Sequence, residues 1–333
     1  MGRYPLVACA RKYLEIVGPA LADATVKELD RRYRRMGKDF AALKAAGKID
    51  TDNPAKMGEK DVLAYVGLLR ARGVKESGIA HNLSSLSALL LHFGNTTVQR
   101  LRREHSRMIP KRHAKRQDPI GGDIASRIFR AAEGVRDWRR LEAHALVIMA
   151  LSTGLRPKEL RLAAIGDLDL GRWILNAEHV KGEGAYGQPR EVPIRPEGRK
   201  TIERYVRVRN AIVAKTAPLN DALFPAIRDK GDGYFAPNSL GQLKRLVEDE
   251  IGARFELRAC RRTFGQGCID EGLSVEAVSL LLGHATTKTT ESYYCRKRPD
   301  AAIKEAEALW SASRPPGAKT PEIEFRKWLP GYG

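Results

Sequence analysis

The sequence predicts a mainly α-helical fold with a small antiparallel β-sheet, arranged as two domains. Apolar residues recur at helical spacing in both halves of the 333-residue chain. Two short strand-like runs flank a glycine-rich loop in the second half. A basic segment containing several prolines and glycines separates the halves and indicates a linker. The length also fits two domains of about 100 to 200 residues each.

The first half, residues 1–107, is predicted to be a helical domain. One apolar face is formed by Leu29, Tyr33, Met36, Phe40 and Leu43, and a second by Ile79, Leu83, Leu86, Leu90 and Phe93. Thr25-Val26-Lys27-Glu28 has the pattern of a capping box, and Gly94-Asn95 is a good helix stop. Shorter helices are expected around 61–70 and 97–105.

Positive charge indicates a polyanionic partner. The chain has 59 Lys and Arg residues against 40 Asp and Glu, a formal net charge of +19. The outer face of the first amphipathic helix is basic, as is the segment 108–120, which we interpret as an interdomain linker. The candidate DNA contacts are Arg31, Arg34, Arg35, Lys38, Lys111, Arg112, Lys115 and Arg116. A solvated charge run is the alternative for the linker, but a basic hinge also suits a clamp around a duplex.

The second half begins with helices predicted at 124–133 and 138–152. Residues 173–175 and 190–194 are expected to form a hairpin around the loop HVKGEGAYGQP, and helical patterns resume from Arg199. The four cysteines show no C-x-x-C pair and no zinc-like spacing, so reduced thiols in a cytoplasm and no bound metal are expected. The longest apolar run, 145–151, is far shorter than the ~20 residues of a membrane helix, so no membrane partner is expected.

Two motifs place a cation on a turn or loop. In TGLRPKEL, Arg156 falls where one helix ends and the next begins, and it either points at a phosphate or forms a surface ion pair with Glu159. In HVKGEG, Gly182 and Gly184 allow Lys181 to approach a ligand closely, although a single loop lysine is usually solvated.

Two further motifs lie near the carboxyl end. In LRACRRTF, Arg258 and Arg261 share one face of a predicted helix start, where guanidinium forks match phosphate oxygens or simply face solvent. In LGHATTKTTESYY, His284 follows a helix ended by Gly283, and Tyr293 lies nine positions further on. Individually, the histidine and tyrosines fit structural roles equally well.

Together and in this order, the four motifs resemble the catalytic domain of the tyrosine recombinases, also called the phage integrase family. The resemblance covers roughly residues 120–298. It implies the two-domain tyrosine recombinase architecture: a core-binding domain at 1–107, a linker at 108–120, a catalytic domain at 121–298, and a C-terminal helix and tail at 299–333 that docks on a neighbouring protomer.

The resemblance also implies an activity and partners. The chain is expected to be an integrase of a mobile element that cleaves and rejoins double-stranded DNA through a 3′-phosphotyrosine, as a homotetramer on two duplexes. No cofactor is expected. The alternatives are a type IB topoisomerase-like enzyme, which acts as a monomer, and a noncatalytic DNA-binding protein that retains the fold.

Residue roles are implied by the same resemblance. Arg156 and Arg261 would bind the nonbridging oxygens of the scissile phosphate, and Lys181 would protonate the leaving 5′-oxygen. Tyr293 would be the nucleophile, with His284 helping it to lose its proton. Arg258 stands where the family usually has histidine, and because arginine does not accept a proton, we expect it to be a third phosphate ligand. Tyr294 is the rival nucleophile, but adjacent helical residues point ~100° apart, so only one tyrosine faces the arginines.

Overall fold

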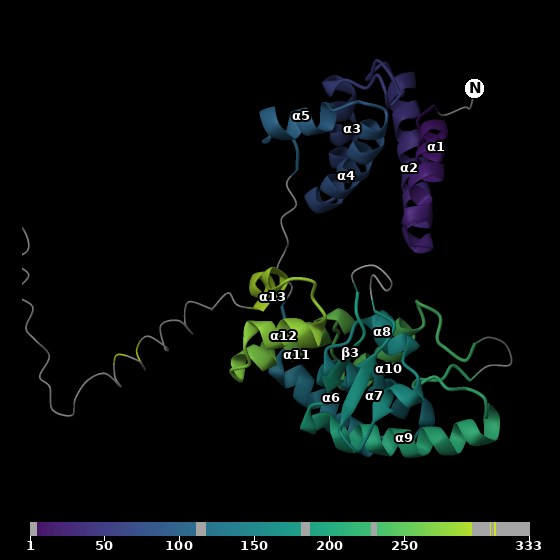
Figure 1. Cartoon of the computed structure of the whole chain (residues 1–333), viewed down its shortest axis with the longest axis vertical. Helices are drawn as coiled ribbons and strands as arrows, with labels where there is room; N and C mark the ends of the chain where they lie inside the picture. The colour runs from purple at the N-terminus through teal and green to yellow at the C-terminus, as the bar shows by residue number, and fades with distance from the viewer. Residues whose placement is uncertain are drawn as a thin grey trace, which may run out of the picture. The chain divides into compact units, whose positions relative to one another are not determined.

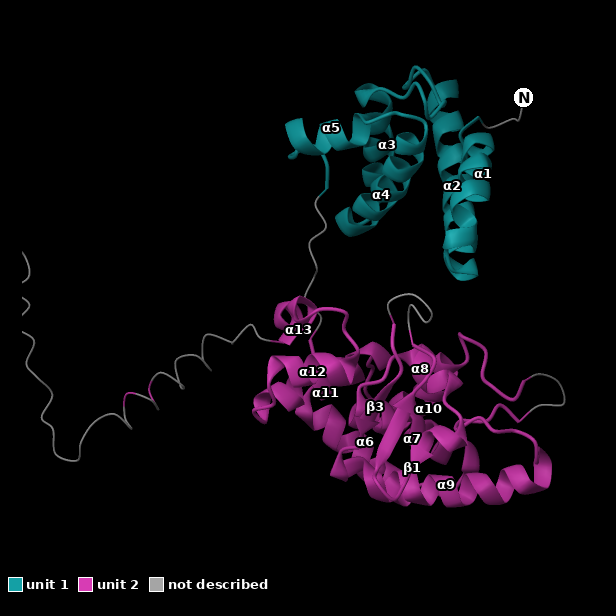
Figure 2. Ribbon diagram, in the orientation of Figure 1, with its two compact units in different colours: residues 1–115 teal, residues 116–333 magenta. Residues whose placement is uncertain are grey.

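A computed structural model describes residues 5–110, 118–180, 187–227 and 232–294, together with residues 307 and 310. The chain divides into two compact units, Met1–Lys115 and Arg116–Gly333 (Figure 2). The division falls within the segment predicted as a linker. Mostly helical units with one small antiparallel sheet confirm the predicted fold class (Figure 1).

Unit 1 is helical throughout its described part. Its helices are α1 (Pro5–Val17), α2 (Asp23–Ala45), α3 (Glu59–Ala71), α4 (Glu76–His92) and α5 (Thr97–Glu104) (Figure 1). Both predicted apolar faces enter one core, in which the rings of Phe40 and Tyr65 stack at 4.8 Å between centroids. The expected capping box is wrong, because α2 begins at Asp23 and Thr25 lies inside the helix.

Unit 2 is built around one helix that is buried on every side. Its helices are α6 (Gly122–Gly134), α7 (Trp138–Thr153), α8 (Pro157–Leu162), α9 (Pro196–Thr216), α10 (Leu240–Ile251), α11 (Leu257–Asp270), α12 (Val275–Leu282) and α13 (Thr287–Tyr294). Every residue of α7 from Leu141 to Thr153 is buried, and α9, α10 and α11 pack around it. The apolar run at 145–151 therefore lies at the centre of the unit 2 core. No helix in the described segments is both long and apolar enough to cross a bilayer.

The sheet has three antiparallel strands in the order β1 (Leu168–Asp169), β2 (Ile174–Ala177) and β3 (Arg190–Pro193). The predicted hairpin corresponds to β2 and β3, with Leu175 opposite Val192. Both of these side chains are fully buried, so this face of the sheet packs on the core. The two-residue strand β1 was not predicted, because it is too short to show a period of two.

The helix ends near the second-half motifs lie where the sequence predicts them. Gly154 and Gly283 end α7 and α12 in the left-handed conformation, with φ of 63° and 60°. Ser274 caps α12 by accepting a hydrogen bond from the Ala277 amide at 3.1 Å. Of the predicted C-terminal helix and tail at 299–333, only Glu307 and Trp310 are described, and both are helical.

Candidate active site

Three of the predicted site residues meet where α7, α11 and α12 end or begin. Arg156 lies on the turn between α7 and α8, Arg261 on α11, and His284 just after α12. The left-handed Gly154 permits this approach, because a Cβ there would lie 2.5 Å from the Phe264 ring. A glycine is therefore needed where the first arginine turn passes under α11.

The carboxyl end of α12 is covered by three guanidinium groups. Arg190 Nε donates to the Leu281 carbonyl at 2.8 Å, and Arg156 Nη2 donates to the Gly283 carbonyl at 2.9 Å. The carbonyl between them, that of Leu282, accepts from Arg261 Nη2. The last carbonyls of a helix have no partner within the helix, and its carboxyl end favours positive charge. Cations from three distant segments therefore surround the turn at the carboxyl end of α12.

Glu159 holds two of these arginines. Its side chain is 1% exposed and accepts from Arg156 Nη1 at 2.6 Å and from Arg190 Nη2 at 2.9 Å. It also accepts from the Arg156 amide at 2.8 Å and, more weakly, from Arg190 Nη1 at 3.4 Å. Burial raises the pKa of Glu159, but the hydrogen bonds and charges of Arg190 and Arg156 outweigh it and leave the pKa below its ordinary value. The Arg156–Glu159 pair considered from sequence exists, but it is internal.

His284 is held in a neutral form. Its Nδ1 lies 2.8 Å from the hydroxyl of Thr290, which is fully buried. Burial, followed by the positive charges of Arg261, Arg156 and Arg190, lowers the pKa of His284 to about 4. At neutral pH the imidazole is therefore uncharged.

The cluster carries excess positive charge in a half-buried place. Burial and the nearby charge of Arg156 lower the pKa of Arg261 below its ordinary value, although a guanidinium stays protonated at neutral pH. Each guanidinium has five N–H donors, and in the described structure Arg156 and Arg261 each use two on protein atoms. The remaining donors and the uncompensated charge favour an anion at this point.

Arg258 lies at the start of α11 and is exposed. Among the described residues it has no hydrogen-bond or ion-pair partner, so its guanidinium is available to a ligand. Lys181, together with the linker candidates Lys111, Arg112, Lys115 and Arg116, lies outside the described residues.

The two tyrosines of α13 have opposite environments. Tyr294 is buried, lies 6.5 Å from the His284 ring in a stacked arrangement, and packs on Gly265. Burial raises its pKa, and Arg261 partly offsets that rise. Tyr293 is 41% exposed. Tyr294 is thus the tyrosine beside His284 and within the influence of Arg261, whereas the resemblance to the tyrosine recombinases implies Tyr293 as the nucleophile.

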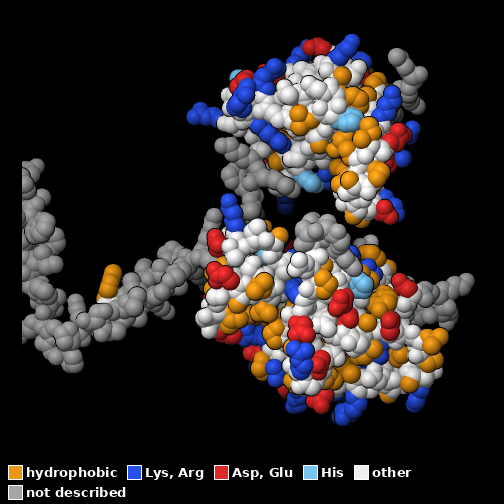
Figure 3. Space-filling view, in the orientation of Figure 1, with side chains coloured by type: hydrophobic (Ala, Val, Ile, Leu, Met, Phe, Trp, Pro, Cys, Tyr) orange, Lys and Arg blue, Asp and Glu red, His pale blue; other side chains and the backbone are white. Residues whose placement is uncertain are grey.

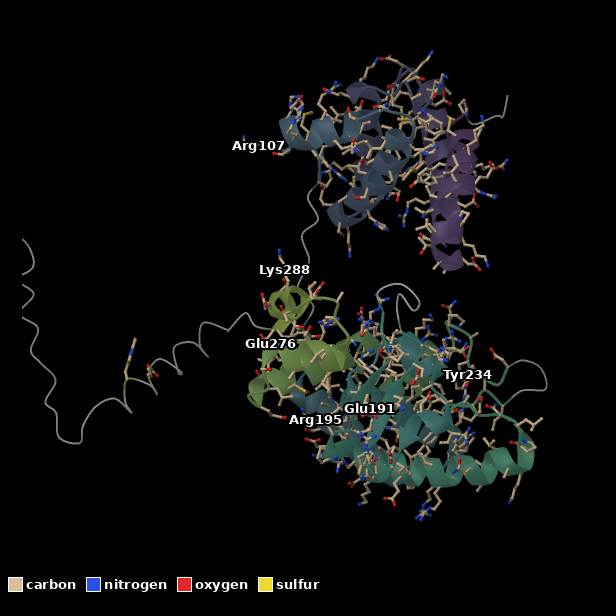
Figure 4. The ribbon with its side chains drawn as sticks, in the orientation of Figure 1. Arg107, Glu191, Arg195, Tyr234, Glu276 and Lys288 are labelled. Atoms are coloured by element: carbon tan, nitrogen blue, oxygen red, sulfur yellow. The ribbon has the colours of Figure 1, made fainter. Side chains whose placement is uncertain are left out.

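Sequence reasoning missed Arg190, Thr290 and the burial of Glu159. Nothing distinguishes Arg190 among 59 basic residues, because its partner Leu281 is 91 positions away. It also missed the basic surface on α5, made by Arg100, Arg102, Arg103 and, just beyond the helix, Arg107. Lys and Arg side chains gather there in Figure 3, and Arg107 is labelled in Figure 4.

On α2, all four predicted DNA contacts are exposed. Arg31 pairs with Glu28, and Arg34 pairs with Asp30 at 2.8 Å. Within residues 5–110, Arg35 and Lys38 form no ion pair. These two are the better candidates to meet a phosphate backbone.

A cluster of fixed cations beside a neutral histidine and two tyrosines, on a helical scaffold, is an arrangement suited to an anionic ligand. Residues 122–300 match the Phage integrase family, which is more than half of the chain, and the chain belongs to this family. It is therefore a tyrosine recombinase by descent, and membership supports site-specific DNA recombination and DNA strand breakage and rejoining as its class of activity.

The chain is 26% identical over 281 residues to a tyrosine recombinase XerC of Chromohalobacter salexigens, covering 83% of this chain and 85% of that one. It is 24% identical over 235 residues to a tyrosine recombinase XerA of Pyrococcus furiosus, covering 70% and 75%. Among solved structures, it resembles the Tn1549 transposon integrase in complex with a circular intermediate DNA, with a TM-score of 0.69, 18% identity and coverage of 92% and 100%. It also resembles a lambda integrase tetramer bound to a Holliday junction, with a TM-score of 0.59, 12% identity and coverage of 86% and 76%.

Proposed function

We propose that the chain is a site-specific recombinase that cleaves and rejoins double-stranded DNA through a 3′-phosphotyrosine on Tyr293. The observation that carries this proposal is the convergence of Arg156, Arg261 and neutral His284 at one anion-receptive turn. Mobile-element integration is the setting we favour, because the fold is shared with a transposon integrase and with lambda integrase. Action as a tetramer on two duplexes is part of the same proposal.

The geometry supports a specific division of labour. Donors of Arg156 and Arg261 that are not used by the protein bind the nonbridging oxygens, and exposed Arg258 adds a third cation. The Tyr293 oxygen attacks phosphorus, the bond from phosphorus to the 5′-oxygen breaks, and Lys181 supplies a proton to that oxygen. The phenol proton passes to His284 or to solvent. Fixed cations stabilise charge that develops in such a transition state, and attack by the 5′-hydroxyl on the phosphotyrosine reverses the step.

Tyr293 is the proposed nucleophile despite facing solvent in the free chain. Its exposure leaves the hydroxyl free to meet a DNA phosphate, whereas Tyr294 is enclosed between His284 and Gly265. DNA that contacts α13 would then bring Tyr293 to the arginines. Lys288, which points outwards from the same helix (Figure 4), is placed to contact such a DNA.

The test is a denaturing-gel assay for a covalent protein–DNA adduct on nicked substrates made from DNA flanking the gene. Wild type is compared with Tyr293→Phe and with Tyr294→Phe, which removes the same hydroxyl one position away. We expect the adduct in wild type and in Tyr294→Phe and none in Tyr293→Phe. DNA binding without any adduct in wild type would favour the noncatalytic reading.

That second candidate has one observation in its favour, which is Arg258 in place of a proton-accepting histidine. It predicts that Tyr293→Phe leaves DNA affinity unchanged and that no strand is cut. The type IB topoisomerase alternative predicts relaxation of supercoiled plasmid by the monomer without a specific sequence. A recombinase instead requires its own sites.

A further inference from the structure

Among the described residues, two cations at the carboxyl end of α12 form ion pairs, Arg190 and Arg156, and Arg190, which comes from the sheet, is the less exposed. It is the first residue of β3, and its side chain is 10% exposed, against 27% for Arg156. Its Nε donates to the Leu281 carbonyl at 2.8 Å. A Cβ on Gly283 would lie 2.8 Å from Arg190 Nη1. The guanidinium thus lies directly against the turn that leads into His284.

The same guanidinium also engages Glu159. Arg190 Nη2 and Nη1 donate to the two carboxylate oxygens at 2.9 and 3.4 Å. Glu159 is shared with Arg156, so one buried negative charge lies between two positive ones. Without Arg190, that carboxylate would have Arg156 as its remaining charged partner. Loss of one partner of a buried charge is strongly unfavourable, so Glu159 would then depend on Arg156 alone and compete with a phosphate for its donors.

Arg190 differs from Arg156 and Arg261 in how its nitrogens are used. All three of its nitrogens donate to protein atoms: Nε to a carbonyl, and both Nη atoms to a carboxylate. In the described part of the chain, Arg156 and Arg261 each donate through Nη1 and Nη2 and not through Nε. The donors of Arg190 are therefore occupied by protein atoms, whereas Arg156 and Arg261 keep donors that a ligand can use.

We propose that Arg190 is a positioning residue. It clamps the Leu281–Gly283 turn to β3, which fixes His284, and it neutralises Glu159, which leaves Arg156 free to bind the scissile phosphate. The effect on cleavage rests on the proposed function, whereas the clamp itself is a property of the free protein.

The test uses two substitutions and a matched control. Arg190→Gln removes the charge and most of the contacts. Arg190→Lys keeps the charge but replaces the planar fork by a point charge that does not span both partners. Arg172→Gln is the control, because Arg172 forms a bidentate pair with Glu191 on the same sheet at 3.0 and 2.9 Å, yet is 61% exposed. Glu191, the neighbour of Arg190 on β3, is labelled in Figure 4.

Three readouts are needed for each variant. The first is the single-turnover rate of adduct formation at saturating DNA, and the second is DNA affinity. The third is the titration of His284 by NMR in the free protein, in which His284→Gln identifies the signal among seven histidines. Thermal unfolding checks that each variant folds.

We expect both Arg190 variants to form the adduct about 10- to 100-fold more slowly, because small displacements of reacting groups slow a reaction by that order. DNA affinity should be unchanged. Arg190→Gln should also raise the pKa of His284, because the positive charge of Arg190 contributes to its depression. Arg190→Lys should leave that pKa near the wild-type value. Arg172→Gln should match wild type in every readout.

Wild-type adduct rates in folded Arg190→Gln and Arg190→Lys would overturn the proposal. Equal losses of rate and of DNA affinity would instead make Arg190 a DNA ligand, and equal losses in Arg172→Gln would indicate general damage to the sheet. If wild type forms no adduct, the proposed function fails. The NMR titration then still decides the clamp, and an unmoved His284 in folded Arg190→Gln would refute it.

Discussion

At the scale of single residues, the site depends on polar groups that lie beneath the surface. Glu159 and Thr290 are buried, and each makes a hydrogen bond to a predicted catalytic side chain. Neither was identifiable as a site residue from the sequence, because burial and partner depend on contacts between distant segments. Arg258 and Tyr293, which are exposed and lie in recognisable motifs, could be named from the sequence and stay predictions.

Replacement of Thr290 tests the neutral, oriented state of His284. Thr290→Val keeps the shape but removes the hydroxyl that contacts His284 Nδ1 at 2.8 Å. An unpaired buried polar group costs about 1 to 3 kcal/mol, so we expect a loss of stability in urea unfolding and slower adduct formation. Thr290→Ser retains the hydroxyl and should preserve both. Equal behaviour of the valine and serine variants would show that the contact is unimportant.

At the scale of elements, sequence periodicity and caps predicted the helices that face the core, and also the turns that carry Arg156 and His284. These features are local, so a few neighbouring residues determine them. Sequence analysis failed where the position of a residue depends on contacts between distant segments. Helix α1 is an exception, because its buried residues Leu6, Ala10 and Leu14 recur at helical spacing and yet the helix was not predicted. The inward position of Tyr294 depends on its packing against Gly265.

The turn after α12 provides a prediction at this scale. Gly283→Ala must hold alanine at φ of 60° and also bring its Cβ against Arg190. Left-handed backbone costs a nonglycine residue about 1 to 2 kcal/mol. Gly272→Ala is the control, since it has φ of 91° and no atom within 4 Å of the added Cβ. We expect both to lower the melting temperature but only Gly283→Ala to slow adduct formation markedly. Similar rates in the two variants would contradict the tight packing at this turn.

Helix α7 contains a buried acid that should make stability depend on pH. Glu142 is fully buried, and burial raises its pKa to about 7, against the opposing influence of Arg139. Its Oε1 has no hydrogen-bond partner among the described residues. The folded state therefore keeps a proton that the unfolded state releases, so stability falls as pH rises from about 4.5 to 7.

Glu142→Gln removes this dependence. We expect little change in stability at pH values below the unfolded pKa of about 4.3, and a gain on the order of 1 to 3 kcal/mol above pH 7. Chemical denaturation across that range measures it. A gain that is the same at every pH would exclude titration of Glu142 as its cause.

At the scale of the whole molecule, the formal charge of +19 is divided between two compact units. On the face seen in Figure 3, Lys and Arg gather on unit 1 over α5, while both signs of charge are mixed on unit 2. Charge composition therefore predicted the class of partner. It did not predict which cations are already paired within the protein.

Free and paired cations of unit 1 should differ in their effect on DNA binding. Alanine at both Arg35 and Lys38 should weaken binding uniformly across DNA sequences and reduce the salt slope by about one phosphate contact per cation. Arg70→Gln is the control, because Arg70 already pairs with Glu76 at 3.0 Å. Binding isotherms at several salt concentrations give the slopes. An unchanged slope in the double variant would remove α2 from the DNA interface.

The central claim is that Tyr293 carries the DNA, and mass spectrometry of the isolated adduct tests it most directly. After nuclease and trypsin digestion, both tyrosines fall in the peptide TTESYYCR, residues 289–296. Fragmentation between them assigns the residual nucleotide to one position. We predict the phosphonucleotide on Tyr293. A nucleotide on Tyr294 would contradict the assignment and make the buried, histidine-stacked tyrosine the nucleophile.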